Sequence, residues 1–126
     1  FDPVFGSLEL PRPEGEPEVL VISSGGTGIP VFRSLQKKNI PFAAGILYTN
    51  DIDYQLAKLL AVHAVIEKPF EEISDRALKE AMALVESCKR VINAGVTIGT
   101  GNKKIAEVLK KASGLGKLET AQDGNI

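Results

Sequence analysis

Several features that would define whole classes of protein are missing from this sequence. Cys88 is the only cysteine among 126 residues, which excludes an internal disulfide and the cysteine-rich zinc patterns. No apolar run approaches the roughly 20 residues of a membrane-spanning helix. The 15 basic residues are balanced by 16 acidic ones, without the clustered basic face that nucleic-acid binding needs. We therefore expect a cytosolic protein that does not bind nucleic acid, with Cys88 as a small buried hydrophobe.

Catalytic signatures are missing as well. The P-loop pattern G-x-x-x-x-G-K-[ST] does not occur, and nothing resembles a Ser-His-Asp or Cys-His arrangement. His63, the only histidine, precedes a predicted strand on the side away from the expected ligand cleft. We expect no catalytic residue in this chain and no ATP hydrolysis by it.

The composition changes near residue 17. Residues 1–17 contain four of the seven prolines, which fix φ and remove backbone donors, so we expect a proline-rich linker or arm. The chain opens on Phe1 instead of Met, which suggests a fragment of a longer protein. From residue 18 to residue 126, apolar runs alternate with amphipathic stretches, which predicts one α/β domain.

Apolar runs predict four buried strands, at residues 19–22, 42–47, 64–66 and 91–92. Strands that alternate with helices indicate right-handed βαβ units and a parallel sheet. The predicted fold is a Rossmann-like three-layer α/β/α domain with strand order 3-2-1-4. Residues 117–120 could add a fifth strand at the edge or form a frayed end.

Apolar residues at helical spacing predict one helix after each of these strands. Ser74 and Asn102 are the expected N-caps of the third and fourth helices, and Gly114 is the expected C′ residue of the fourth. The predicted apolar stripes are Val31, Phe32 and Leu35; Ile52, Leu56, Leu59 and Leu60; Ala77, Leu78, Ala81, Met82, Val85 and Cys88; and Ile105, Val108, Leu109 and Ala112.

The loops after the first and fourth predicted strands are rich in glycine. Ligands of open parallel sheets bind beyond the carboxyl ends of the strands, where the strand order reverses, and here that point lies between these two strands. Glycine lets the backbone approach a ligand, and a helix N-terminus attracts an anion. We expect an anionic or nucleotide-like ligand on residues of this edge: Ser24, Gly25, Gly26, Thr27, Gly28, Asn50, Asp51, Asp53, Gly99, Gly101 and Asn102.

Each of these loops also has a purely structural interpretation. Gly26 and Gly28 match two positions of G-x-G-x-x-G, but Val31 occupies the third, so a tight turn explains them nearly as well. Asn50, Asp51 and Asp53 could simply cap the second helix, and they are too few to predict a metal site. Lys103 lies in a first helical turn, where a cation is disfavoured; an anionic ligand or chance would explain it.

Four motifs in order resemble a known family. They are S-G-G-T-G at residues 24–28, G-I-L-Y-T-N-D-I-D-Y at 45–54, P-F-E-E-I-S at 69–74 and I-G-T-G-N at 98–102. The chain resembles the C-terminal extension of ATP-binding subunits of ABC importers of the iron-complex and cobalamin type. The resemblance covers residues 1 to about 112, since D-P-V-F-G at 2–6 is similar to the segment that joins the ATPase to the extension.

The resemblance implies a cytosolic regulatory domain appended to an ATPase. Its partners would be the ATPase domain of the same chain and the membrane subunits of the transporter, at the inner membrane, with ATP bound by the parent and not by this fragment. It adds Pro69 and Phe70 to the candidate ligand-binding residues. Tyr48, Asn50 and Ile98 depart from the family pattern, so the ligand could differ; the cofactor is unknown.

Two other classes of function stay open. A free-standing nucleotide-dependent enzyme would need a proton-transfer residue in the cleft, for which Asp51, Asp53 and Tyr48 are the candidates. A structural module that forms a homodimer would bind no ligand at all. The transported substrate cannot be named from the sequence.

Overall fold

The described residues form one α/β unit. The computed structural model describes residues 13–24, 28–47, 51–67, 73–96 and 103–121. These residues contain five strands and four helices, in the chain order β1 (Val19–Ser24), α1 (Ile29–Lys37), β2 (Phe42–Leu47), α2 (Asp51–Leu60), β3 (His63–Glu67), α3 (Asp75–Ser87), β4 (Arg90–Ala94), α4 (Lys103–Gly114) and β5 (Leu118–Thr120).

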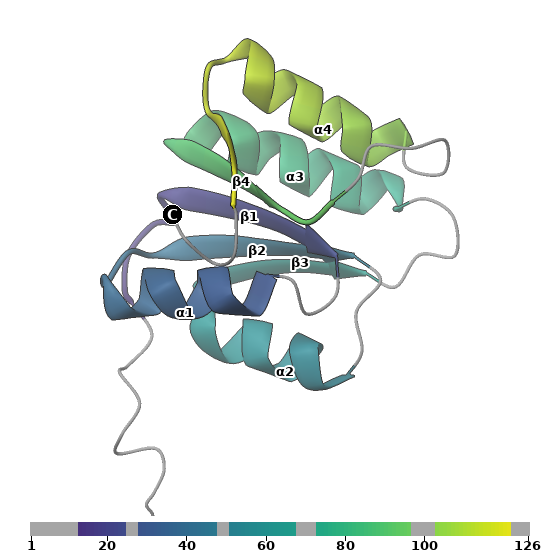
Figure 1. Cartoon of the computed structure of the whole chain (residues 1–126). Coiled ribbons are helices and arrows are strands. Elements are labelled where there is room, and N and C mark those ends of the chain that lie inside the picture. Colours follow the sequence, from purple (N-terminus) through teal and green to yellow (C-terminus); the bar gives the residue numbers. More distant parts are fainter. Residues whose placement is uncertain (1–12, 25–27, 48–50, 68–72, 97–102, 122–126) are drawn as a thin grey trace, which may run out of the picture.

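All the strands pair in parallel, in the order β3-β2-β1-β4-β5. Helices α1 and α2 cover one face of the sheet, and α3 and α4 cover the other (Figure 1). The predicted three-layer Rossmann-like fold and its strand order are confirmed. Residues 118–120 do form a fifth strand, which is an edge strand beside β4.

The two faces of the sheet bury two separate apolar clusters, because alternate residues of each strand point to opposite faces. Val19 and Val21 of β1 belong to the cluster under α1 and α2, whereas Leu20 and Ile22 belong to the cluster under α3 and α4. The first cluster includes the stacked rings of Phe32 and Phe42, whose centroids are 5.2 Å apart.

The four predicted strands lie at the correct positions, but three of them were predicted too short. The bounds of β2 agree with the prediction, but β1 continues through Ser23 and Ser24, two residues beyond the predicted strand at 19–22. Ser23 pairs with Ile46 of β2 and Ala94 of β4, so it lies in the body of the sheet.

Wherever their side chains are described, the helix stripes are confirmed except at Leu59 in α2; the side chain of Ile52 lies outside the described set. Leu59 is 67% exposed, while Ala57 and Leu60 are buried. The buried face of α2, at Ala57 and Leu60, packs against α1 and the edge strand β3. The stripe of α4 is buried in full, at Ile105, Val108, Leu109 and Ala112.

The helix ends confirm one predicted cap and correct another. The Oγ of Ser74 accepts a hydrogen bond from the amide of Ala77, 3.1 Å away, as expected of an N-cap. Gly114 is still helical, so its prediction as the C′ residue was wrong. Gly116 takes that place: its φ is +72°, and it and Lys117 donate to the carbonyls of Ser113 and Ala112.

The described end of the proline-rich arm contacts the domain. Pro13 is buried. The thiol of Cys88 donates a hydrogen bond to the carbonyl of Pro17, with 3.6 Å between sulfur and oxygen. Cys88 is the buried apolar side chain that was expected. In the described part of the chain, no helix combines the length and the hydropathy needed to cross a membrane.

Candidate functional site

The carboxyl ends of the parallel strands meet at one edge of the sheet, and β1 lies at its switch point. Strand β1 pairs with β2 on one side and with β4 on the other. The chain passes from β1 to β2 through α1 on one face, and it enters β4 from α3 on the opposite face (Figure 1). The predicted reversal of strand order between β1 and β4 is therefore present, and it is where such sheets bind ligands.

Ser23 is an unexpected polar group at this point. It follows Val21 by two residues, so its side chain faces α1, and it is completely buried. Among the described residues its hydroxyl has no hydrogen-bond partner. A buried hydroxyl without a partner costs about 1–3 kcal/mol, so this group is an exception in the core that needs an explanation.

Gly28 lies directly against Ser23 and begins helix α1. A Cβ atom on Gly28 would be 2.5 Å from the Oγ of Ser23 and 2.6 Å from its Cβ. The φ of Gly28 is −84°, which any residue can adopt, so the glycine is required by close packing and not by backbone conformation. The start of α1 can approach the end of β1 only because no side chain separates them.

The described residues at the N-terminus of α1 do not compensate the positive end of the helix dipole. Its first turn contains no acidic residue, and its N-cap, Gly28, offers no side-chain oxygen. Helix α3 is the contrast, because Ser74 caps it and Asp75 lies in its first turn. The first amides of α1 and the hydroxyl of Ser23 are thus hydrogen-bond donors that lie at the same point of the sheet edge.

The end of β4 is held by the side chain of Asn93, which was not among the predicted site residues. The Oδ1 of Asn93 accepts from the amide of Val96 at 2.8 Å, and its Nδ2 donates to the carbonyl of Val96 at 3.0 Å. Gly95 lies inside this turn with a φ of +87°, which favours glycine. Asn93 therefore fixes the exit of β4, and both ends of its amide are used within the chain.

The start of α4 contains a lysine whose partners are structural. The Nζ of Lys104 lies 2.9 Å from a carboxylate oxygen of Asp75 and donates to the carbonyl of Ile73 at 3.1 Å. The hydrogen bond from Lys104 lowers the pKa of Asp75, and its charge adds to this. Lys103, the residue that suggested an anionic ligand, is exposed at the first position of the helix. Lys104 is therefore explained by its contacts with Asp75 and Ile73, without a ligand.

The structure describes only some of the other predicted site residues. Ser24 ends β1, and Asp51 and Asp53 lie in the first turn of α2, with side chains outside the described set. His63 is the exposed first residue of β3, at the edge opposite the carboxyl ends, as predicted. The positions outside the described residues are Gly25, Gly26, Thr27, Tyr48, Asn50, Pro69, Phe70, Gly99, Gly101 and Asn102.

Metal-binding side chains do not gather in the described part of the chain. No group of three His, Cys, Asp or Glu residues there is placed to hold a metal ion. The chemistry that the described site offers is hydrogen-bond donation by Ser23 and by the first amides of α1, without a described proton-transfer group beside them.

Comparison with known proteins assigns the chain to a family. The model of the MJ0874 family matches residues 42–121, which is more than half of the sequence and runs from β2 to just beyond β5. No curated protein and no solved structure matches the chain. The chain therefore belongs to the MJ0874 family.

Proposed function

We propose that this chain is an accessory ligand-binding domain that takes an anionic or nucleotide-like small molecule at the carboxyl edge of its sheet, between β1 and β4. The observation that carries the proposal is the hydroxyl of Ser23, fully buried and without a partner among the described residues, beneath the glycine that begins α1. An apolar residue of the same size would avoid the cost of burying an unpartnered hydroxyl.

A bound anion would use this hydroxyl together with the helix. An oxygen of a phosphate or carboxylate accepts hydrogen bonds from amides of the first turn of α1, where the helix dipole favours negative charge. Ile29 and Val31 can supply such amides, whereas Pro30 has none. The hydroxyl of Ser23 would be a third hydrogen-bond donor to the same anion, beside these two amides.

The wider setting that we propose is the regulatory extension of an ABC importer of the iron-complex or related type. Its support is the ordered set of four motifs, and no contact within the fold bears on it. The parent chain would carry the ATPase, and the domain would lie on the cytoplasmic side, attached to the membrane through the transporter. Sequencing the gene upstream of these codons tests this setting: an in-frame Walker A and signature motif would support it, and an independent gene would contradict it.

The ligand site is tested by the variant Ser23→Ala in a thermal-shift titration with inorganic phosphate, AMP and ATP. Ligands that bind the native state raise its melting temperature by mass action. We expect at least one of these probes to stabilise the wild type and to lose most of this effect in Ser23→Ala. Without ligand, the variant should melt at the same temperature or higher, because the buried unpartnered hydroxyl is gone.

Ser113→Ala is the matched control, since Ser113 is an exposed serine near the end of α4, far from the carboxyl edge. It should respond to the probes as the wild type does. If no probe at millimolar concentration shifts the wild type, or if both variants respond alike, the anion site is refuted and a structural module becomes the better account.

A further inference from the structure

The edge of the sheet at β5 is open to another chain. In the described part of the protein, β5 is the last strand in the sheet order and pairs only with β4. Together with α4 it ends the domain on the side opposite to α2 and β3 (Figure 1). An unpaired strand edge presents a row of backbone donors and acceptors that can pair with a further strand.

The backbone groups of Leu118 and Thr120 point toward this free edge. The carbonyl of Lys117 accepts a hydrogen bond from an amide of β4, and the amide of Ala121 donates one to a carbonyl of β4. Successive residues of a strand turn their backbone groups alternately to one neighbour and to the other. Residues 117 and 121 bond to β4, so residues 118 and 120 offer their amides and carbonyls to a strand on the other side.

The charged residue of this strand does not protect the edge. Edge strands are often blunted by a charged side chain that stays in water. Glu119 is instead bound by Arg90 of β4 through two hydrogen bonds, of 2.6 and 2.8 Å. Its charge is therefore neutralised within the sheet, while Thr120 beside it is exposed.

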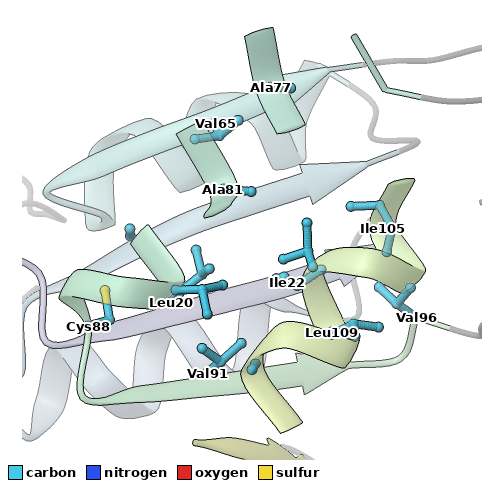
Figure 2. Close-up of a cluster of buried hydrophobic side chains, with 14 of the residues drawn as sticks. Leu20, Ile22, Val65, Ala77, Ala81, Cys88, Val91, Val96, Ile105 and Leu109 are labelled. Atoms are coloured by element: carbon cyan, nitrogen blue, oxygen red, sulfur yellow. The ribbon is translucent and has the colours of Figure 1, made fainter. Parts of the chain in front are cut away.

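Helix α4 has one side that faces away from the rest of the domain. Ile105 and Leu109 belong to the buried cluster beneath the helix (Figure 2). Lys104 and Lys111 reach α3, where each pairs with a carboxylate. The side of α4 opposite to these two lysines borders the sheet edge at β5.

An open groove runs between this side of α4 and β5. Its volume is about 550 Å³, and Ala106, Leu109 and Lys110 of α4 and Leu118 of β5 are among its lining residues. Lys110 is exposed, whereas Leu118 is half-buried and packs against the buried cluster. The groove thus has an apolar wall beside the free strand edge and a cation at its rim. A partner that fits it brings a strand for the edge and a carboxylate for Lys110.

The charges of α4 complement those of a second α4 that runs in the opposite direction. Glu107 and Lys110 are exposed and lie nearly one turn apart. The amide of Lys117 donates to the carbonyl of Ala112 at 2.9 Å, so these two residues are at the same level. With rises of about 1.5 Å per helix residue and about 3.3 Å per strand residue, Glu119 is level with about position 108 of α4. A two-fold axis through Glu119 therefore brings Glu107 of one copy close to the level of Lys110 of the other.

We propose that this edge is the interface of a homodimer, in which a second copy of the chain is related by a two-fold axis beside Glu119. Leu118 of each copy then pairs with Thr120 of the other, and these are the residues whose backbone groups are directed outward. Helix α4 of each copy lies along the groove of the other, with Glu107 near Lys110. Since a two-fold axis repeats every contact, this ion pair occurs twice. The inference does not depend on the anion site, which lies at the carboxyl edge.

Charge reversal tests the interface, with sedimentation velocity of the full chain from micromolar to millimolar concentration as the measurement. We expect the wild type to dimerise in this range. Lys110→Glu should weaken the dimer about tenfold, because like charges then meet at two places. Glu107→Lys should do the same, and the double variant Glu107→Lys/Lys110→Glu should restore the affinity. Lys79→Glu, at an exposed position in α3, is the matched control and should dimerise as the wild type does.

Thr120→Pro tests the strand pairing separately. Proline is tolerated in an edge strand where the amide that it removes faces outward, so far-UV circular dichroism should show an unchanged fold. The dimer should be at least tenfold weaker. A wild type that stays monomeric at millimolar concentration would overturn the inference. Single charge reversals without effect, or a double variant that does not recover the dimer, would overturn it as well.

Discussion

A Cβ atom on Gly28 would lie 2.5 Å from the hydroxyl oxygen of Ser23. This contact joins the last part of β1 to the first turn of α1 at the switch point of the sheet. It makes the two residues a coupled pair: the missing side chain at position 28 lets the helix approach the strand, and the small side chain at position 23 leaves the space for it.

Gly28→Ala should destabilise the domain by about 1–3 kcal/mol, the usual cost of forcing extra atoms into a packed site. Ser23→Gly in the same background should recover part of that loss, because both atoms of the clash belong to the Ser23 side chain. Urea unfolding of the two single variants and the double variant measures this coupling. Strictly additive effects would show that the two residues do not pack as described.

Two nearby glycines should respond to alanine with opposite signs. Gly114 is helical and Gly116 has a φ of +72°, and neither would bring a Cβ atom within 4 Å of another group. Gly114→Ala should stabilise by about 0.5–1 kcal/mol, because it restricts the unfolded chain. Gly116→Ala should destabilise by about 1 kcal/mol, because of its left-handed backbone. Chemical denaturation compares them directly, and a shared sign would contradict the assigned end of α4.

The ion pair of Arg90 and Glu119 should make the free energy of unfolding fall at low pH. The guanidinium donates two hydrogen bonds to the carboxylate, at 2.6 and 2.8 Å, and these lower the pKa of Glu119 from its ordinary value of 4.5. Because the pKa is lower in the folded state, the stabilisation is present above pH 4.5 and is lost as the pH falls through the folded value. Both side chains are more than a third exposed, so the contribution is at most about 1 kcal/mol.

Glu119→Gln should therefore lower the unfolding free energy at pH 7 and make its decline in acid shallower. Glu107→Gln, at an exposed position in α4, controls for the loss of one negative charge. Unfolding curves between pH 3 and pH 7 give the comparison. If the unfolding free energy of Glu119→Gln falls in acid as steeply as that of the wild type, the ion pair does not cause the pH dependence.

Cys88 should be chemically protected in the folded protein. The side chain is 1% exposed, and its burial raises the pKa of the thiol, so little of the reactive thiolate forms near pH 8. A thiol reagent added at pH 8 should label the native protein only slowly and the urea-unfolded protein at once. Rapid labelling of the native protein would show that the contact with Pro17 at the end of α3 does not protect Cys88 from the reagent.

The sequence predicts the layers of this fold better than its site, for a physical reason. The run before Tyr48 is apolar without interruption, and Pro41 precedes it, so the strand at residues 42–47 could be recognised locally. Leu59 was misplaced, because the width of a buried helix face depends on what the helix covers. Spacing alone does not reveal that α2 packs against α1 and the edge strand β3.

The role of Ser23 could not be read from its surroundings in the sequence. It precedes two glycines and looks like the start of a loop, but its spacing from Val21 is the alternation of a strand, which is the one signal that could have found it. Its burial and its contact with Gly28 follow from the return of the chain through α1. Gly28 was predicted as a ligand-binding glycine, and its packing role became visible only with the sheet assembled.

The central claim, an anion site at the start of α1, is tested most directly by an amide NMR titration of the wild type with inorganic phosphate and AMP. We predict saturable shifts centred on the amides of Gly28, Ile29 and Val31, with the same dissociation constant for all three. The amides of the α4 C-terminal turn, such as Ser113, should stay unchanged. Saturable binding that shifts the first turn of α4 and leaves that of α1 unchanged, or no saturable shift at all, would contradict the account.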